Sequence, residues 1–94
     1  MATLSIHPIE DALAEMGMET GYHSTDDYGV YSIRNGSREI EILEAVSLDA
    51  FNSENVVEAI LYGDGNAVQN MTETFEEVES VEDFLKAVAE VMNN

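Results

Sequence analysis

The chain has 94 residues and carries 20 acidic against 3 basic side chains, which gives a net charge of −17. It contains no cysteine, so disulfides, zinc–thiolate sites and cysteine nucleophiles are excluded. Its apolar runs are far shorter than the ~20 residues of a transmembrane helix, and it begins without the basic and apolar regions of a signal peptide. These features predict one domain, residues 1–94, in the cytoplasm and away from membranes.

The net charge also restricts the possible partners. Only Arg34, Arg38 and Lys86 could neutralise a phosphate, so we expect no direct binding to nucleic acid or to an anionic membrane. An attractive partner must itself be cationic. A basic protein, a metal ion or a counter-ion atmosphere would meet that condition, and we expect a basic protein, in particular one that binds nucleic acid.

A helix is predicted over about residues 8–16. Pro8 suits the first helical turn, where its missing N–H is no loss. Ile9, Leu13 and Met16 then recur at helical spacing and form one apolar stripe. Gly17 follows as the expected helix end.

Residues 28–43 show the clearest pattern, a β-hairpin around Asn35 and Gly36. With these two residues as the loop, Arg34 lies opposite Ser37, Ile33 opposite Arg38, and Tyr31 opposite Ile40. The inner face then carries Tyr31, Ile33, Ile40 and Ile42, and the outer face carries Val30, Ser32, Glu39 and Glu41. Residues 18–23 fit either a short strand or the entry to this hairpin, and 24–27 fit a turn.

The second half predicts a second hairpin and a second helix. Ser47 could cap a single helical turn over 48–51, and 52–55 fit a loop. Strands are predicted over 56–62 and 67–75, joined by a turn at 63–66. Ser80 and Asp83 form a capping box for a helix over 81–92. The expected fold is α+β: a four-stranded antiparallel sheet flanked by an N-terminal and a C-terminal helix on one face. We expect the core to include Ile9, Leu13, Met16, Tyr31, Ile33, Ile40, Ile42, Val57, Ile60, Tyr62, Phe84, Val88 and Val91.

Two groups of carboxylates are candidate partner-binding sites. Glu73, Glu76, Glu77 and Glu79 form a dense ridge before the last helix, continued by Glu82 and Asp83, which also suit the helix dipole. Glu39 and Glu41 share one strand face about 6.6–6.8 Å apart, comparable with neighbouring phosphates on a nucleic-acid strand. Glu58 extends that row if its strand is adjacent. Tyr28 is the expected exposed aromatic anchor.

No enzyme or metal motif accompanies these groups. The loops at Asp26–Asp27 and at Asp64 lack the ligand spacing of a calcium loop and fit ordinary turns. No serine lies in a nucleophile frame, and a domain this small rarely builds the cleft that paired catalytic carboxylates need. We therefore expect no catalysis, no cofactor and no metal site.

With its charge of −17 and the carboxylates at Glu39, Glu41, Glu73, Glu76, Glu77 and Glu79, the chain resembles small acidic α+β anti-defence proteins of phages. These include anti-CRISPR proteins and DNA mimics. The resemblance is one of composition and element order, and it implies that the chain blocks a nucleic-acid-binding groove without catalysis. Two other interpretations stay open: an immunity protein or acidic adaptor bound to a basic toxin, and a salt-adapted domain. Halophilic chains commonly favour Asp, whereas this chain has 14 Glu and 6 Asp.

Overall fold

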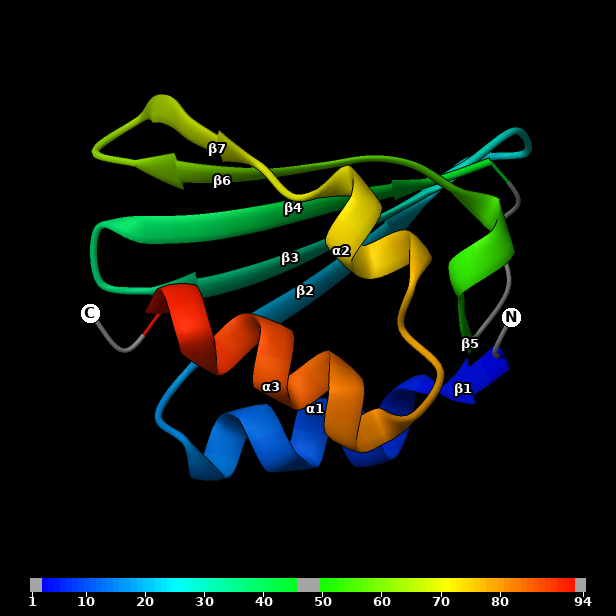
Figure 1. Cartoon of the computed structure of the whole chain (residues 1–94), viewed down its shortest axis with the longest axis horizontal. Coiled ribbons are helices and arrows are strands. Elements are labelled where there is room, and N and C mark those ends of the chain that lie inside the picture. Colours follow the sequence, from blue (N-terminus) through cyan, green and yellow to red (C-terminus); the bar gives the residue numbers. More distant parts are fainter. Residues whose placement is uncertain (1–2, 46–49, 93–94) are drawn as a thin grey trace.

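The computed structural model describes residues 3–45 and 50–92, and it has an α+β fold. Helices α1, α2 and α3 lie on one side of the main sheet, with α1 and α3 next to each other (Figure 1). The elements in chain order are β1 (Thr3–Ser5), α1 (Ile6–Glu15), β2 (Glu19–Ser24), β3 (Gly29–Asn35), β4 (Arg38–Glu44), β5 (Ala50–Asn52), the 3-10 helix η1 (Ser53–Asn55), β6 (Val56–Gly63), β7 (Asn66–Asn70), α2 (Thr72–Glu76) and α3 (Val81–Met92).

The main sheet is antiparallel and has five strands in the order β2-β3-β4-β6-β7. The prediction of four strands was short by one, because residues 19–24 pair fully with β3 and form β2. A small second sheet pairs β1 with β5. Both helices predicted from the sequence are present, and α2 is an additional one.

The first hairpin is confirmed, but its predicted register was wrong by two residues. Asn35, not Arg34, is the last paired residue of β3, and it lies opposite Arg38. Ile33 therefore lies opposite Ile40, and Tyr31 opposite Ile42. Because the shift is an even number of residues, each side chain keeps its predicted face. The inner-face residues Tyr31, Ile33, Ile40 and Ile42 are all buried.

The register follows from the turn and from a tertiary contact of Asn35. Gly36 has a φ of +62° and is the first of two central residues, the position that glycine takes in a type II′ turn. Asn35 stays in the strand, and its side-chain Nδ2 donates a hydrogen bond of 2.9 Å to the carbonyl oxygen of Met92. The prediction placed Asn35 in the loop because it did not consider this contact with α3.

The ends of the two long helices follow the predicted capping signals. Gly17 has a φ of +83°, and the N–H groups of Gly17 and Met18 donate to the carbonyls of Ala14 and Leu13. This is a Schellman motif, and it ends α1. Helix α1 begins at Ile6, two residues earlier than predicted, and ends at Glu15, one residue earlier. Met16 is therefore the C-cap, and it is 38% exposed instead of buried.

The capping box at the start of α3 is also present. The N–H of Asp83 donates to Oγ of Ser80 at 3.1 Å. The Asp83 carboxylate reaches back one residue further than expected and accepts from the N–H of Glu79 at 3.1 Å. The first bond satisfies an N–H group that the first turn of the helix cannot pair internally, and the second fixes the chain just before the helix.

Strand β6 presents a different set of residues to the core than we predicted. Val56, Ala59 and Leu61 are buried, whereas Val57 is 54% exposed. Ile60 and Tyr62 are half-buried on the outer face, opposite Glu41 and Glu39 on β4. Ile60 and Tyr62 face outward because they alternate with the buried Ala59 and Leu61. Val57 is exposed because of a bulge: Leu43 pairs with Glu58 and Glu44 with Val56, so Val57 has no partner on β4.

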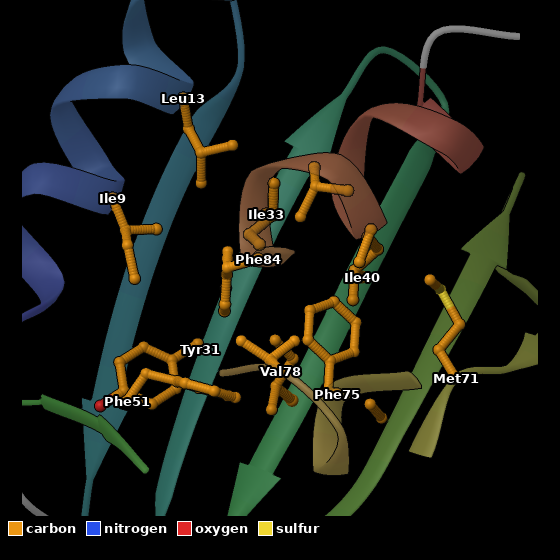
Figure 2. Packing of buried hydrophobic residues seen from close by; sticks show 14 of the residues in the cluster. Ile9, Leu13, Tyr31, Ile33, Ile40, Phe51, Met71, Phe75, Val78 and Phe84 are labelled. Atoms are coloured by element: carbon orange, nitrogen blue, oxygen red, sulfur yellow. The ribbon is translucent and has the colours of Figure 1, made fainter. Parts of the chain in front are cut away.

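The segment predicted as one long strand over 67–75 divides into β7 and α2. Its apolar residues Met71 and Phe75 are both buried, but Phe75 projects from α2. Phe51, Phe75 and Phe84 form an edge-to-face group with ring centroids 5.0–6.3 Å apart, and thereby join β5, α2 and α3 (Figure 2). Phe51 lies on the extended strand β5, not in a helical turn, and the predicted cap and first residues of that turn, 47–49, lie outside the described residues.

The core fills the space between the sheet and the helices. Of the predicted members, Ile9, Leu13, Tyr31, Ile33, Ile40, Ile42, Phe84 and Val88 are buried, and Val91 is half-buried. The prediction missed Met18, Phe51, Val56, Ala59, Leu61, Met71, Phe75, Val78, Ala87 and Met92.

Candidate functional site

Among residues 3–45 and 50–92, no helix covers the outer face of the main sheet (Figure 1). Alternation along the strands places Glu39 and Glu41 of β4 on this face, as predicted. Glu58 lies on the adjacent strand β6, opposite Leu43, so it shares the face and extends the group. We call Glu39, Glu41 and Glu58 the sheet-face carboxylates.

The two outward-facing carboxylates of β4, Glu39 and Glu41, differ in their partners. Arg34, the cross-strand neighbour of Glu39, donates to Oε1 of Glu39 from Nη2 at 2.9 Å and from Nε at 3.1 Å. Glu41 has no Lys or Arg partner among the described residues. Partial burial raises the pKa of Glu41, and its hydrogen bond with Glu39 and the charge of Glu39 raise it further. Glu41 is therefore the carboxylate of β4 that would gain most from an incoming cation.

A shallow groove of about 370 Å³ lies where β4 meets the two hairpin turns. Its lining includes Glu39, Glu41 and Tyr62, the two arginines Arg34 and Arg38, and the turns at Gly36 and Gly65. An aromatic ring beside two carboxylates suits a planar guanidinium, which pairs with carboxylates and stacks on rings. The sequence did not indicate Tyr62 here, because we had predicted it to be in the core.

The second predicted group does not join the first. Glu73 and Glu76 lie on α2, and Glu77 is its C-cap, so these carboxylates are on the helix side of the sheet (Figure 1). Glu79 follows in the connection to α3. All four side chains are exposed. One flat partner surface could therefore not contact both groups at once, which divides the predicted site in two.

Tyr28 lies in the turn between β2 and β3 and is 39% exposed. The turn is held by the N–H of Thr25, which donates to the carbonyl of Tyr28 at 2.8 Å. Tyr28 therefore stands at one end of the sheet, whereas Glu39 and the groove lie beside the opposite end of β3. The predicted anchor is exposed but separate from the groove.

Two of the three cationic side chains are engaged within the protein. Arg34 pairs with Glu39, and Nη1 of Arg38 donates to the carbonyl of Val91 at 2.7 Å. Lys86 is exposed on α3 but shares its surroundings with Glu77, Asp83 and Glu90. The surface consequently offers no basic patch for a phosphate backbone among the described residues.

One carboxyl that the prediction did not consider is buried. Glu44 ends β4, is 1% exposed, and accepts a hydrogen bond of 2.8 Å from the N–H of Asn52. Burial raises the pKa of Glu44 to about 7, although the hydrogen bond from the N–H of Asn52 opposes the shift. The pattern Ile40-x-Ile42-x-Glu44 already placed this residue on the inner face.

Tyr31 connects Glu44 to the backbone of β5. The Tyr31 hydroxyl lies 2.7 Å from the carbonyl oxygen of Ala50, which can only accept, so the single hydroxyl proton is given there. The hydrogen bond between Tyr31 and Glu44 then fits a protonated Glu44 that donates to the tyrosine oxygen. At 1% exposure this carboxyl is inaccessible to a substrate, so we assign it a structural role in holding β5.

The described residues contain no group of three or more His, Asp or Glu side chains arranged to hold a metal ion. Among the same residues, no helix has the length and apolar character needed to cross a membrane. No family model, no curated protein and no solved structure matches the chain.

Proposed function

We propose that the chain is a non-catalytic binding protein that presents carboxylates to the basic groove of a nucleic-acid-binding protein. This is the action of a DNA mimic of the anti-CRISPR or anti-restriction type, and it would take place in the cytoplasm of a host cell. The observation that carries the proposal is the outer sheet face, which no helix of the described residues covers; on it Glu39 lies opposite the half-buried Tyr62, and Glu41 and Glu58 continue the acidic group toward the other end of the strands.

Physical chemistry supports this surface over the α2 carboxylates as the primary contact. A sheet holds the Cβ atoms of its outward residues at fixed spacing, and the two bonds from Arg34 already order the Glu39 carboxylate. Outward apolar residues, Val30, Leu43 and Ile60, lie between the carboxylates and could exclude water from the ion pairs. The α2 carboxylates would add long-range attraction and speed association.

The test is competition for a captured partner. Proteins retained on the immobilised chain at low salt and released at high salt are identified, and the purified partner is loaded with labelled DNA or RNA. The chain should displace the label, and the charge reversal Glu41→Lys with Glu58→Lys should abolish displacement. A partner that holds its nucleic acid and this chain together would contradict the proposal. A partner that is a toxin nuclease would indicate the immunity-protein interpretation.

A further inference from the structure

Strand β2 forms an edge of the main sheet with which no other described strand pairs. It is the terminal strand in the order β2-β3-β4-β6-β7, and all six of its residues are exposed. Its pairing with β3 runs from Glu19 to Ser24 without interruption. Proteins usually protect such edges with lysines, prolines, bulges or a covering segment. β2 contains no lysine, proline or bulge, whereas the opposite edge strand, β7, has a register irregularity against β6.

The orientation of the β2 backbone follows from the turn that closes this hairpin. The N–H of Thr25 donates to the carbonyl of Tyr28, and this pair continues the register of β2 and β3. Hydrogen-bonded and non-hydrogen-bonded pairs alternate in an antiparallel ladder, so His23, Gly21 and Glu19 direct their main-chain groups toward β3. The N–H and C=O groups of Thr20 and Ser24 then point to the open edge.

A hollow runs beside this edge. It has a volume of about 250 Å³ and lies between α1 and β2, with Ile6, His7, Glu10, Tyr22 and Tyr31 as its lining. Thr20 and Ser24 pair with inner-face residues of β3, so their side chains lie on the same side of the sheet as α1. A residue of an added strand that paired with Thr20 or Ser24 would direct its side chain to this side, toward the hollow.

The charges around the edge of β2 determine which kind of chain could pair with it. A second copy would bring together two chains that each carry −17, and the resulting repulsion opposes that dimer. The edge has Glu19 at one end and Asp26 and Asp27 just beyond the other, and Glu10 lies in the wall of the hollow. An extended segment with cationic side chains is complementary to these groups.

We infer that β2 binds an extended, basic segment of a partner protein, which adds a sixth strand to the sheet. The segment alternates apolar residues, which face the hollow beside α1, with Arg or Lys residues on the outer face. Main-chain hydrogen bonds at Thr20 and Ser24 give affinity, and the alternation gives specificity. The inference rests on strand geometry and net charge, and it holds or fails independently of the competition with nucleic acid proposed above.

A synthetic peptide tests this inference on the full chain. The probe is a blocked seven-residue peptide of alternating arginine and valine, beginning and ending with arginine. Its binding should slow hydrogen exchange of the Thr20 and Ser24 amides by about tenfold or more, because these amides become hydrogen-bonded. Protection confined to β7, or none at β2 under saturation, would overturn the inference.

Matched peptides separate strand addition from simple charge attraction. N-methylation of the three valines removes the peptide N–H donors that face β2 and should weaken binding by about tenfold or more. N-methylation of three arginines is the control, and it should change the affinity by less than about threefold. A scrambled peptide of the same composition should bind weakly, and one with glutamate in place of arginine should not bind. Equal affinity of the alternating and scrambled peptides would show charge attraction alone and overturn the inference.

Two measurements on the protein complete the test. Thr20→Pro removes an edge N–H at a position where an edge strand tolerates proline, and it should lower peptide affinity while the amide spectrum of β3 and β4 is retained. If this variant fails to fold, the methylated peptides still decide the question. Sedimentation of the chain alone should give a monomer, and a dimer that Thr20→Pro abolishes would assign the edge to a second copy instead.

Discussion

Nη1 of Arg38 donates a hydrogen bond of 2.7 Å to the carbonyl oxygen of Val91, and so links the first hairpin to the last turn of α3. Asn35, directly opposite Arg38 in the hairpin, makes the equivalent bond to the carbonyl of Met92. The C-terminal end of a helix leaves carbonyl groups unpaired and carries partial negative charge. A cation there therefore stabilises the helix both by hydrogen bonding and by charge. One hairpin end therefore caps a helix that begins more than 40 residues later in the chain.

Replacing Arg38 by Gln should lower the free energy of unfolding by about 1–2 kcal/mol, because the charge-assisted bond to Val91 is lost. The measurement is chemical denaturation monitored by circular dichroism. Lys86→Gln is the matched control, since it removes the same charge from an exposed position on α3. It should change the free energy by less than about 0.5 kcal/mol. Equal losses in the two variants would mean that net charge, not the cap, is responsible.

The buried Glu44 should make stability depend on pH. Its pKa is raised to about 7 in the folded protein from 4.5 in a free side chain, a difference of about 2.5 that corresponds to roughly 3 kcal/mol. The neutral form of Glu44 stabilises the folded protein, and this contribution to the free energy of unfolding is fully present below about pH 4.5. It is lost as the pH rises toward and through 7, because the folded protein then bears a buried charge.

Glu44→Gln isolates this effect, because glutamine stays neutral and can still accept from Asn52 and donate to Tyr31. At pH 8 the variant should be more stable than the wild type by up to about 3 kcal/mol, and near pH 4 the two should be equal. Thermal unfolding across this range is the measurement. Glu58→Gln, on the exposed outer face, removes one carboxylate without changing the core. A pH profile unchanged in Glu44→Gln would show that Glu44 does not control it.

Ile40→Ala should lower the free energy of unfolding by about 2–4 kcal/mol, since Ile40 is fully buried in the middle of β4. Val57→Ala is the informative comparison. Val57 belongs to the predicted core but is 54% exposed at the bulge of β6, so its truncation should cost less than about 0.5 kcal/mol. Similar losses of stability at both positions would contradict the observed orientation of β6, in which Val57 is exposed.

Moderate salt should raise the melting temperature. Repulsion among the carboxylates destabilises the folded chain, and added sodium chloride screens it over a Debye length of about 10 Å at 0.1 M. Differential scanning calorimetry from about 0.02 to 0.5 M salt measures the effect. Sodium chloride and potassium chloride at equal ionic strength should act alike, because screening depends on ionic strength. A melting temperature that falls over this range would indicate a surface without net repulsion.

Two double variants with the same charge change should distinguish the two acidic surfaces. Glu41→Lys with Glu58→Lys should raise the dissociation rate of the captured partner, because these carboxylates lie in the proposed contact. Glu76→Lys with Glu77→Lys should mainly slow association and weaken its salt dependence. Surface plasmon resonance separates the two rates. The reverse result would move the contact to α2.

The elements that could be predicted from the sequence are those whose signals lie in neighbouring residues. The helix ends at Gly17 and Ser80 depend on neighbouring residues only, and both follow the prediction. The faces of the first hairpin were also predictable, because alternation in β3 and β4 is strict. The sheet-face carboxylates Glu39 and Glu41 were identified for the same reason.

Most of the features that failed depend on distant contacts. Phe75 was assigned to a strand by alternation, but it packs with Phe51 and Phe84 from a helix. The local signal for that change is the Asn70 side chain, which accepts from the N–H of Thr72 where α2 begins, and the prediction did not use it. The bulge at Val57 shifts the phase of β6 and arises only when β6 pairs with β4. The separation of the two acidic surfaces likewise requires knowledge of which side of the sheet α2 occupies.

Alternation along β4 gives adjacent positions different evolutionary freedom. Ile40, Ile42 and Glu44 are buried, whereas Glu39 and Glu41 face outward next to them. Selection by a changing partner can therefore act on the odd-numbered residues while the even-numbered residues keep the fold. A lineage under such pressure would accumulate substitutions at every second position of this strand. A complete substitution scan of β4 would show tolerated changes with the same two-residue period.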